Sequence, residues 1–385
     1  MKNQRLMSLD ALRGFDMFFI MGLSGLVATL CALWPNPVTD AIAHNMEHVA
    51  WDGLTHHDTI FPLFLFLAGV SFPFSYAKQQ ELGYSKAKVY AKIFRRAAML
   101  IFLGLIYNGL FRFDFENLRC ASVLARIGIA WMGAALLYVN FGVKTRAWIS
   151  VAILVGYALL SKYVGAPDVV DADPLSREGN LVGYIDRMFM PGRLIYDNNT
   201  FDPEGLFSTL PAIVTAMLGM FTGEFVRKDN LPSVRRTAEE GSGRQERFSV
   251  GTRKAGYMGL AALGMLAVGL VWSLVFPINK ALWTSSFVLV VGSYSLAMFA
   301  LFYYIIDVRG WQKWSLPLRV IGLNSITIYM AQAIFDFNGL TRYFFGGVAR
   351  ICGDDWRQVI MTGGYLLISW LFLWFLYRKK IFLKV

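Results

Sequence analysis

The sequence is poor in charged residues, in cysteine and in histidine, and each shortage excludes a class of protein. Only 16% of the residues are charged and 56% are hydrophobic, whereas an ordinary soluble domain is about a quarter charged. This balance excludes a soluble globular domain and indicates an integral membrane protein. Cys31, Cys120 and Cys352 share no close spacing, which excludes a disulfide framework and a cysteine-based metal site.

Apolar segments, by contrast, are abundant, and each is long enough, at roughly 20 residues, to cross a hydrocarbon core as a helix. Because backbone groups in lipid must pair within the chain, helices are the expected form. The sequence therefore predicts an all-α, polytopic transmembrane helix bundle of about 10 spans, with residues 1–385 forming a single domain. The predicted spans are 14–34, 59–77, 94–111, 122–140, 147–165, 206–226, 255–275, 282–304, 317–336 and 358–377.

The basic residues predict the orientation of this bundle. Most of the 37 Lys and Arg residues lie in loops and tails on the side of the N-terminus. Cytoplasmic loops carry such an excess, and an even number of spans returns the chain to its starting side, so both termini are predicted to be cytoplasmic. The net charge of +11 lies in short loops, where topology and contact with anionic lipid explain it, so we expect no nucleic-acid partner.

Two polar segments interrupt the apolar pattern. Residues 166–205 are rich in Asp, Gly, Pro and Asn, which favour turns, and we expect an extracytoplasmic loop that folds as a lid more than as a helix. Residues 227–254 are low in apolar content, and we expect a flexible cytoplasmic loop, for which a simple tether is the plain interpretation.

All four histidines of the chain lie in one segment, HNMEHVAWDGLTHHD, just before a predicted span. An imidazole accepts a proton from an amine or hydroxyl nucleophile near neutral pH, so His48 is a candidate catalytic base. Asp58 is a candidate to orient that ring through its other nitrogen. A zinc site is an alternative, but the segment has neither an H-E-x-x-H motif nor a cysteine, and we expect no metal. The simplest alternative is a solvent-exposed loop whose histidines have no catalytic role.

Ionisable residues at membrane depth are costly unless they are paired or face water, so each is a functional candidate. Arg119 and Arg126 frame the segment RCASVLARIGIAW near the predicted outer end of the fourth span, and each needs a cavity or a carboxylate beside it. Asp202 and Glu204 stand at the mouth of the sixth span, where Asp202 is alternatively the N-cap of a helix.

Two further polar sites lie at or within predicted spans. Asp10 and Arg13, at the start of the first helix, are spaced to pair on one face, either as an anchor at the helix start or as part of a site. Asn324 brings an amide into an apolar span, where it either hydrogen-bonds between helices or contacts a ligand.

At these residues the sequence resembles a known family. HVAWDGLTHHDTIFPLFLFLAG is similar to the signature H-x-x-W-[ND]-G-x-T-x-x-D-x-x-x-P-x-F-x-F-x-x-G of heparan-alpha-glucosaminide N-acetyltransferase and its bacterial relatives. The segments RLMSLDALRGFDM, VLARIGIAW, GYIDRMF, FDPEGLFSTLPAI, FPINKALWTSSFVL, YYIIDVRGW and GLNSITIYMAQAIF also resemble family blocks, in the family's order. The resemblance covers most of the chain.

The resemblance implies an acetyltransferase of the bacterial inner membrane. The family's enzymes move an acetyl group from cytosolic acetyl-CoA to the amine of a terminal glucosamine on the far side of the membrane, and the signature histidine falls on His48. We therefore expect Asp58 to assist His48, and the acceptor to be bound by Trp51, Asp52, Arg119, Arg126, Asp202, Glu204 and Asn324. Candidate partners for the acetyl-CoA phosphates are Arg13, Arg95, Arg96, Arg227, Lys254 and Arg309.

Several alternatives stay open at this point. His48 acts either as a general base or as a covalent acetyl carrier. One alternative is an O-acetyltransferase that acts on an envelope glycan through the same histidine chemistry. Another is a transporter for an amino sugar or another small solute, which catalyses no reaction but would also need polar residues within the membrane. The expected partners are the bilayer, acetyl-CoA and the acceptor. The Trp-rich outer faces are also compatible with a homodimer.

Overall fold

The computed structural model describes residues 6–195, 199–228 and 243–383, and within these ranges the chain is helical with no named strand. The all-α prediction is confirmed for these residues. The chain divides into two compact units, and the expectation that residues 1–385 form a single domain stays a prediction. The backbone passes from one unit to the other at residues 50–54, within one helix at residues 60–61 and within another at residues 300–301.

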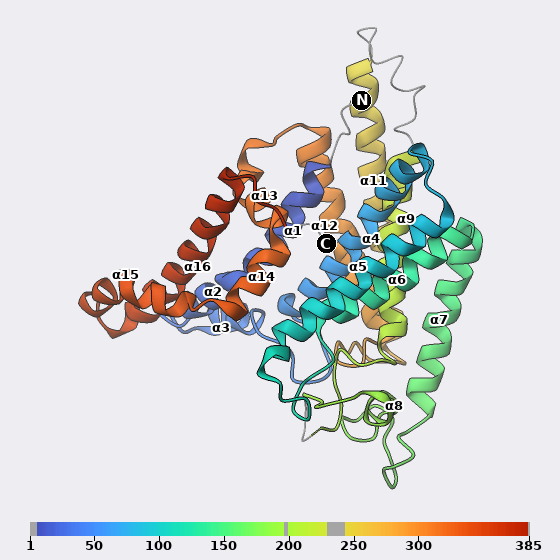
Figure 1. Cartoon of the computed structure of the whole chain (residues 1–385), viewed down its shortest axis with the longest axis horizontal. Coiled ribbons are helices and arrows are strands. Elements are labelled where there is room, and N and C mark those ends of the chain that lie inside the picture. Colours follow the sequence, from blue (N-terminus) through green and yellow to red (C-terminus); the bar gives the residue numbers. More distant parts are fainter. Residues whose placement is uncertain (1–5, 196–198, 229–242, 384–385) are drawn as a thin grey trace. The chain divides into compact units, whose positions relative to one another are not determined.

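The first unit comprises residues 6–50, 54–60 and 301–383. Its N-terminal helix is kinked at Gly22, whose backbone φ is 139°, within a π-helical turn. Its elements in Figure 1 are α1 (Met7–Phe18), η1 (Phe19–Leu23), α2 (Ser24–Cys31), α3 (Pro37–His44), the first turn of α4 (His56–Glu81), η3 (Tyr303–Val308), η4 (Lys313–Ser315), α13 (Leu316–Leu323), α14 (Ser325–Ile334), α15 (Phe337–Ile351) and α16 (Asp354–Arg378).

The second unit comprises residues 51–53 and the described part of 61–300. Apart from the short α8, it consists of long helices. These elements are the rest of α4, α5 (Lys86–Tyr107), η2 (Leu110–Arg112), α6 (Val123–Asn140), α7 (Val143–Tyr163), α8 (Leu181–Phe189), α9 (Thr209–Lys228), α11 (Gly243–Ser273) and α12 (Ser285–Phe302).

Eight helical segments among the described residues are long and apolar enough to cross a membrane, and they coincide with eight of the predicted spans. The predicted span 94–111 falls in α5, whose N-terminal half carries Arg95 and Arg96 and leaves a short apolar run. The predicted span 317–336 is interrupted at Asn324, where α13 ends and α14 begins. The protein is therefore a multi-pass membrane protein, and the count of about 10 spans stays a prediction.

Both polar segments contain more helix than the sequence predicted. Residues 166–205 fold around α8, which begins after Asn180 because the side chain of Asn180 accepts a hydrogen bond from the Gly183 amide at 2.6 Å. Residues 243–254 belong to the helix α11, and the expectation that residues 227–254 are flexible stays a prediction. The part of that expectation that concerns residues 229–242 lies outside the described residues.

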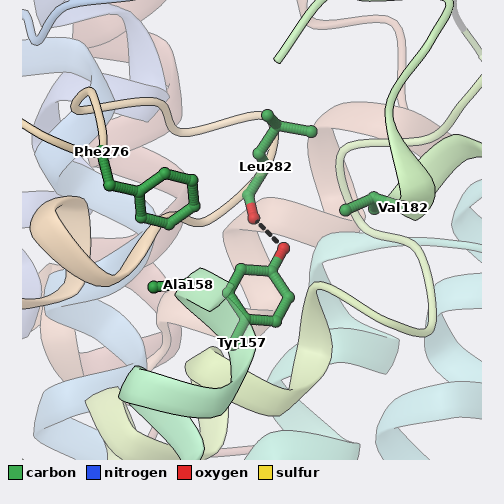
Figure 2. Close-up of a cluster of buried hydrophobic side chains, with 5 residues drawn as sticks. All are labelled: Tyr157, Ala158, Val182, Phe276 and Leu282. Carbon is green, nitrogen blue, oxygen red and sulfur yellow. Dashed lines mark hydrogen bonds between the residues drawn. The ribbon is translucent and has the colours of Figure 1, made fainter. Parts of the chain in front are cut away.

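A buried apolar cluster fixes α8 to the second unit, and Figure 2 shows its five side chains. Tyr157 and Ala158 come from α7, Val182 comes from α8, and the other two members, Phe276 and Leu282, lie in the segment before α12. The hydroxyl of Tyr157 donates a hydrogen bond to the carbonyl of Leu282. This cluster holds the polar segment 166–205 against the ends of the spanning helices, and Trp51 packs on it.

Within the second unit, glycines let α4 and α9 approach closely. Gly219 and Gly223 form a G-x-x-x-G pattern on α9, and a Cβ added to Gly219 would clash with the backbone carbonyl of Phe66. Small residues at this spacing allow backbones of membrane helices to pack directly.

Replacing Gly219 by Ala is therefore expected to destabilise the protein by about 1–3 kcal/mol, because the backbone of α4 cannot move aside as a flexible side chain would. The thermal unfolding midpoint in detergent measures this effect. Gly259→Ala is the matched control, since a Cβ at that glycine of α11 meets nothing within 4 Å. Equal midpoints for the two variants would contradict close packing at Gly219.

Candidate active site

A histidine and a carboxylate form the core of the candidate site, in the first unit. Nδ1 of His48 lies 2.7 Å from Oδ1 of Asp58. A carboxylate only accepts hydrogen bonds, so the imidazole donates through Nδ1 and carries its lone pair on Nε2. The side chain of His48 is 53% exposed and that of Asp58 is 1% exposed. The pair thus has a buried acceptor and a ring that solvent reaches.

Asp58 also fixes the backbone around His48. Its Oδ2 accepts hydrogen bonds from the amide of Val49 at 3.3 Å and from the amide and hydroxyl of Thr55 at 3.2 and 2.9 Å. The Thr55 hydroxyl in turn lies 2.6 Å from the carbonyl of Glu47. Because Asp58 is in the first turn of α4, the positive end of the helix dipole stabilises its charge. The Asp58 carboxylate therefore fixes both the orientation of the His48 ring and the backbone conformation of the loop.

The other histidines of the segment make different contacts. The ring of His57 lies edge-on to that of His48, with 4.5 Å between centroids, and its Nδ1 is 3.2 Å from the hydroxyl of Ser24. The ring of His56 packs on Phe19 at 4.4 Å. Among the described residues, no three His, Cys, Asp or Glu side chains are grouped as a metal site requires.

Trp51 and Asp52, predicted to bind the acceptor, hold the chain in the second unit. The indole N–H of Trp51 donates to the carbonyl of Leu175 at 2.9 Å, and its ring lies edge-on to Phe201. Asp52 accepts a hydrogen bond from the side-chain amide of Asn279 at 3.0 Å. These contacts give both residues a positioning role in the loop that follows His48.

The structure brings Arg119, Asp202 and Glu204 together, and so places carboxylates beside Arg119. Arg119 donates to both oxygens of Asp202, at 2.7 and 2.6 Å, and also to Glu204. Asp202 is fully buried. A bidentate pair with a second carboxylate beside it leaves this guanidinium committed to its own chain. The alternative that Asp202 is the N-cap of α9 does not hold, because α9 begins at Thr209.

Arg126 and Asp186 both hydrogen-bond to the turn at residues 205–208. Arg126 is 1% exposed and donates through Nη2 to the carbonyl of Gly205 and to Ser208. Its Nε and Nη1 have no partner within the described part of the chain. Asp186, on α8, accepts from the amide of Leu206 at 2.8 Å. Burial raises the pKa of Asp186 to about 7. Asp186 was not predictable as a site residue, because its partner Leu206 is 20 positions away and no motif spacing reports that contact.

Asn324 is buried at the break between α13 and α14 in the first unit. Its amide donates to the carbonyl of Ile381 at 3.2 Å, and its oxygen accepts from Thr327 at 3.3 Å. These bonds stabilise the interruption of the helix. The structure therefore gives Asn324 a structural role besides the predicted contact with the acceptor.

The predicted phosphate partners do not form one cluster. In the second unit Arg95 is exposed, Arg96 stacks over the ring of Trp131 at 4.2 Å, and Lys254 donates to the carbonyl of Val226 at 2.6 Å, beside Arg227. In the first unit, Arg13 lies 4.0 Å from Asp10, as the i, i+3 spacing predicted, and Arg309 donates to the hydroxyl of Tyr304 at 2.9 Å.

Arg146, on α7, was not predicted as a site residue, but the structure gives it the features of one. Arg146 is 3% exposed, pairs with Glu224 at 2.7 Å and lies over the ring of Tyr138. Its Nε and Nη1 have no hydrogen-bond partner among the residues described, and neither does Nε of Arg227. Nothing in its sequence context distinguishes it from other basic residues at the ends of spans.

A multi-pass helical membrane protein with a histidine–carboxylate pair is the class that these observations define. A family model described as a domain of unknown function (DUF5009) matches residues 5–158. Heparan-alpha-glucosaminide N-acetyltransferase of Homo sapiens is 25% identical over 386 aligned residues, which cover 88% of this chain and 56% of that protein. The protein of the same name from Mus musculus is 24% identical over 391 residues, with the same coverage.

The chain is therefore a relative of heparan-alpha-glucosaminide N-acetyltransferase, as the motifs predicted, and it spans about half the length of these curated relatives. The DUF5009 match includes His48, Asp58, Arg119 and Arg126.

Asp186 gives the fold a predictable dependence on pH. The folded protein holds the proton of this carboxyl up to about pH 7, whereas an unfolded chain releases it near pH 4. The contribution to stability is thus fully present below about pH 4 and is lost as the pH rises through about 7. Asp186→Asn mimics the protonated acid, so its Tm relative to wild type is expected to increase, by roughly a few degrees, between pH 5 and pH 8.

Asp168→Asn serves as the control of opposite sign. A hydrogen bond from Arg187 lowers the pKa of Asp168, so this variant loses stability relative to wild type only above about pH 4. A constant difference in Tm between Asp186→Asn and wild type across the range would show that Asp186 is ionised in the folded protein.

Proposed function

We propose that the protein is a transmembrane acetyltransferase of the bacterial inner membrane. It moves an acetyl group from cytosolic acetyl-CoA to the amine of a glucosamine or glucosaminide on the periplasmic side, with both termini in the cytoplasm. The curated relatives are named N-acetyltransferases, and the excess of basic residues in alternate loops supports this orientation.

The observation that carries this proposal is the pair formed by His48 and Asp58. A ring nitrogen held at 2.7 Å by a buried carboxylate is fixed in one tautomer, with the basic lone pair on Nε2 and the imidazolium form stabilised by the adjacent charge. General base catalysis needs this arrangement, since proton transfer depends on geometry as well as on basicity.

In the direct reaction, the neutral amine of the acceptor attacks the carbonyl carbon of the thioester. A carbon–nitrogen bond forms, the carbon–sulfur bond breaks, and CoA leaves as a thiolate. Nε2 of His48 accepts the proton that the amine sheds and delivers it to the thiolate. Asp58 keeps its own charge and stabilises the imidazolium between these two steps.

The covalent route uses the same atoms in two steps. Nε2 of His48 attacks the thioester carbonyl, the carbon–sulfur bond breaks, and the CoA thiolate takes up a proton from solvent. The amine then attacks the acetyl-imidazole, a carbon–nitrogen bond to the acceptor forms, and the carbon–nitrogen bond to His48 breaks. The ring recovers its lone pair, and the amine releases one proton to solvent, which balances the proton taken up by the thiolate.

The nucleotide end of acetyl-CoA is assigned to basic residues of the second unit, among them Arg96, Arg227 and Lys254. The support is that Arg146 and Arg227 have buried N–H donors without partners among the described residues. Guanidinium groups bind phosphate oxygens through several N–H donors at once, so unused donors suit this ligand.

A carrier for an amino sugar is the second candidate, and one observation favours it. The predicted span 317–336 is broken at Asn324 into α13 and α14, and discontinuous helices surround the substrate sites of many transporters. A carrier takes up labelled glucosamine into vesicles without releasing CoA, whereas the acetyltransferase releases CoA in proportion to labelled N-acetylglucosamine.

The catalytic pair is tested by replacing its members. His48→Ala is expected to lower kcat for transfer from labelled acetyl-CoA to glucosamine by roughly 10²–10⁴-fold, because the reaction loses its proton acceptor. Asp58→Asn is expected to lower kcat as well, since an amide supplies no charge to stabilise the imidazolium. His44→Ala is the matched control, because His44 is an exposed residue at the end of α3.

Full activity of His48→Ala in protein of unchanged Tm would eliminate the proposed role of His48. The same assay separates the two routes: one equivalent of CoA released in the absence of amine indicates the acetyl-imidazole, and no release without amine indicates direct transfer.

The phosphate assignment is tested by a change in affinity. Arg227→Gln removes the guanidinium charge and is expected to raise KM for acetyl-CoA roughly tenfold with little change in kcat, since a hydrogen bond to a charged group is lost from binding. Arg253→Gln, at an exposed position of α11, is the control. A KM for acetyl-CoA equal to that of wild type would remove Arg227 from the nucleotide site.

A further inference from the structure

A cavity in the first unit lies outside every residue assigned above. Its volume is about 510 Å³, within the range of sites for small molecules. It is lined by residues at the end of α2 and by the first turns of α16: Thr29, Ala32, Leu33, Trp34, Asp355, Trp356 and Gln358.

Two tryptophan rings form the apolar part of this cavity. Trp34 and Trp356 lie edge to face, with 6.1 Å between centroids and an interplanar angle of 80°. They are 59% and 44% exposed. The backbone of Trp34 is fixed, because its carbonyl accepts hydrogen bonds from Asn36 and Thr39 at 2.8 Å each, at the cap of α3. Two anchored, accessible aromatic faces at an angle to each other suit a ligand with an apolar face.

Polar groups complete the lining. The carboxylate of Asp355 and the side-chain amide of Gln358 make no hydrogen bond or ion pair with any residue that the structure describes, and the same holds for both indole N–H groups. A carboxylate beside aromatic faces is the combination that binds an organic cation, since the ring quadrupole and the negative charge attract the same group. The amide and the indoles supply donors and an acceptor for hydroxyl groups.

We propose that this cavity is a second sugar-binding subsite, which takes a hexosamine unit with a protonated amine. An amino sugar presents the three features that the walls match: a C–H face for the indole rings, an ammonium for Asp355, and hydroxyls for Gln358. A protonated amine does not attack a thioester, so this unit is bound and is not the one acetylated. The cavity thus holds a neighbouring unit of an oligosaccharide acceptor.

The identity of the sugar rests on the proposed function, because the acetylated amine is that of a glucosaminide. His48 and the cavity belong to the same compact unit, and α3 connects Trp34 to the loop that carries His48. Tryptophan at the ends of spanning helices also anchors proteins in the bilayer interface, and the experiment separates this explanation from sugar binding.

The test is calorimetric binding of a glucosamine tetrasaccharide to the full chain in lipid nanodiscs without acetyl-CoA. Asp355→Asn is expected to weaken binding roughly tenfold, and Trp356→Ala by a similar factor. Asp354→Asn removes the neighbouring carboxylate, which does not line the cavity, and is expected to bind like wild type. Trp356→Phe keeps an aromatic face and is expected to restore most of the affinity in folded protein.

The fully N-acetylated tetrasaccharide carries no ammonium, so wild type is expected to bind it as weakly as Asp355→Asn binds the amine form. Equal affinity of wild type, Asp355→Asn and Trp356→Ala for the amine form would overturn the subsite and leave the bilayer anchor. His48→Ala distinguishes this failure from failure of the proposed function, because it is expected to bind the tetrasaccharide normally and to transfer the acetyl group roughly 10²–10⁴-fold more slowly than wild type.

Discussion

The buried carboxylate of Asp58 is the constraint on which the candidate site depends. It accepts four hydrogen bonds from His48, Val49 and Thr55. A carboxylate removed from water without such partners would cost several kcal/mol. The loop between α3 and α4 therefore packs around Asp58 and supplies these hydrogen-bond donors, and the same contacts fix the orientation of the His48 ring. The neighbouring residues Asp52 and Gly53 make their own bonds within the second unit, to Asn279 and Ile278.

Much of the fold was predictable because the bilayer leaves few choices. A chain that passes through lipid must pair its backbone groups internally, so each long apolar run becomes a helix. Two predicted spans do not appear among the eight long apolar helices of the described part of the chain, and each has its own reason. In α5, Arg95 and Arg96 shorten the apolar run. At Asn324 the side chain bonds to Ile381, far along the chain, and hydropathy does not register such a contact. The helix α8 escaped prediction because contacts of Val182 and Asp186 with distant segments stabilise it, whereas its local composition favours turns.

In the candidate site, too, some features were predictable from the sequence and others were not. His48 and Asp58 lie in one short segment, and Asp58 was a candidate to orient the His48 ring because a carboxylate accepts a hydrogen bond from an imidazole; the structure shows this hydrogen bond. The sequence predicted Arg119 near the outer end of one span and Asp202 and Glu204 at the mouth of another, and the structure shows that these three residues bind one another. An arginine that serves two carboxylates has fewer N–H groups left to donate to an acceptor sugar. Arg126 keeps Nε and Nη1 without a hydrogen-bond partner among the described residues, which makes it the better candidate of the two arginines for the predicted contact with the acceptor.

The charges of this cluster also account for Asp186. Arg119 and Arg126 supply two positive charges, and Asp202 and Glu204 supply two negative ones, so the buried group is balanced as it stands. A third ionised carboxylate would leave one negative charge uncompensated in a region of low dielectric, which is why burial favours the neutral acid at Asp186. A ligand that meets Nε and Nη1 of Arg126 faces the same balance. A neutral acceptor such as a sugar hydroxyl keeps the cluster uncharged, whereas a carboxylate ligand would not, so the pairing of these residues favours a neutral oxygen at this position.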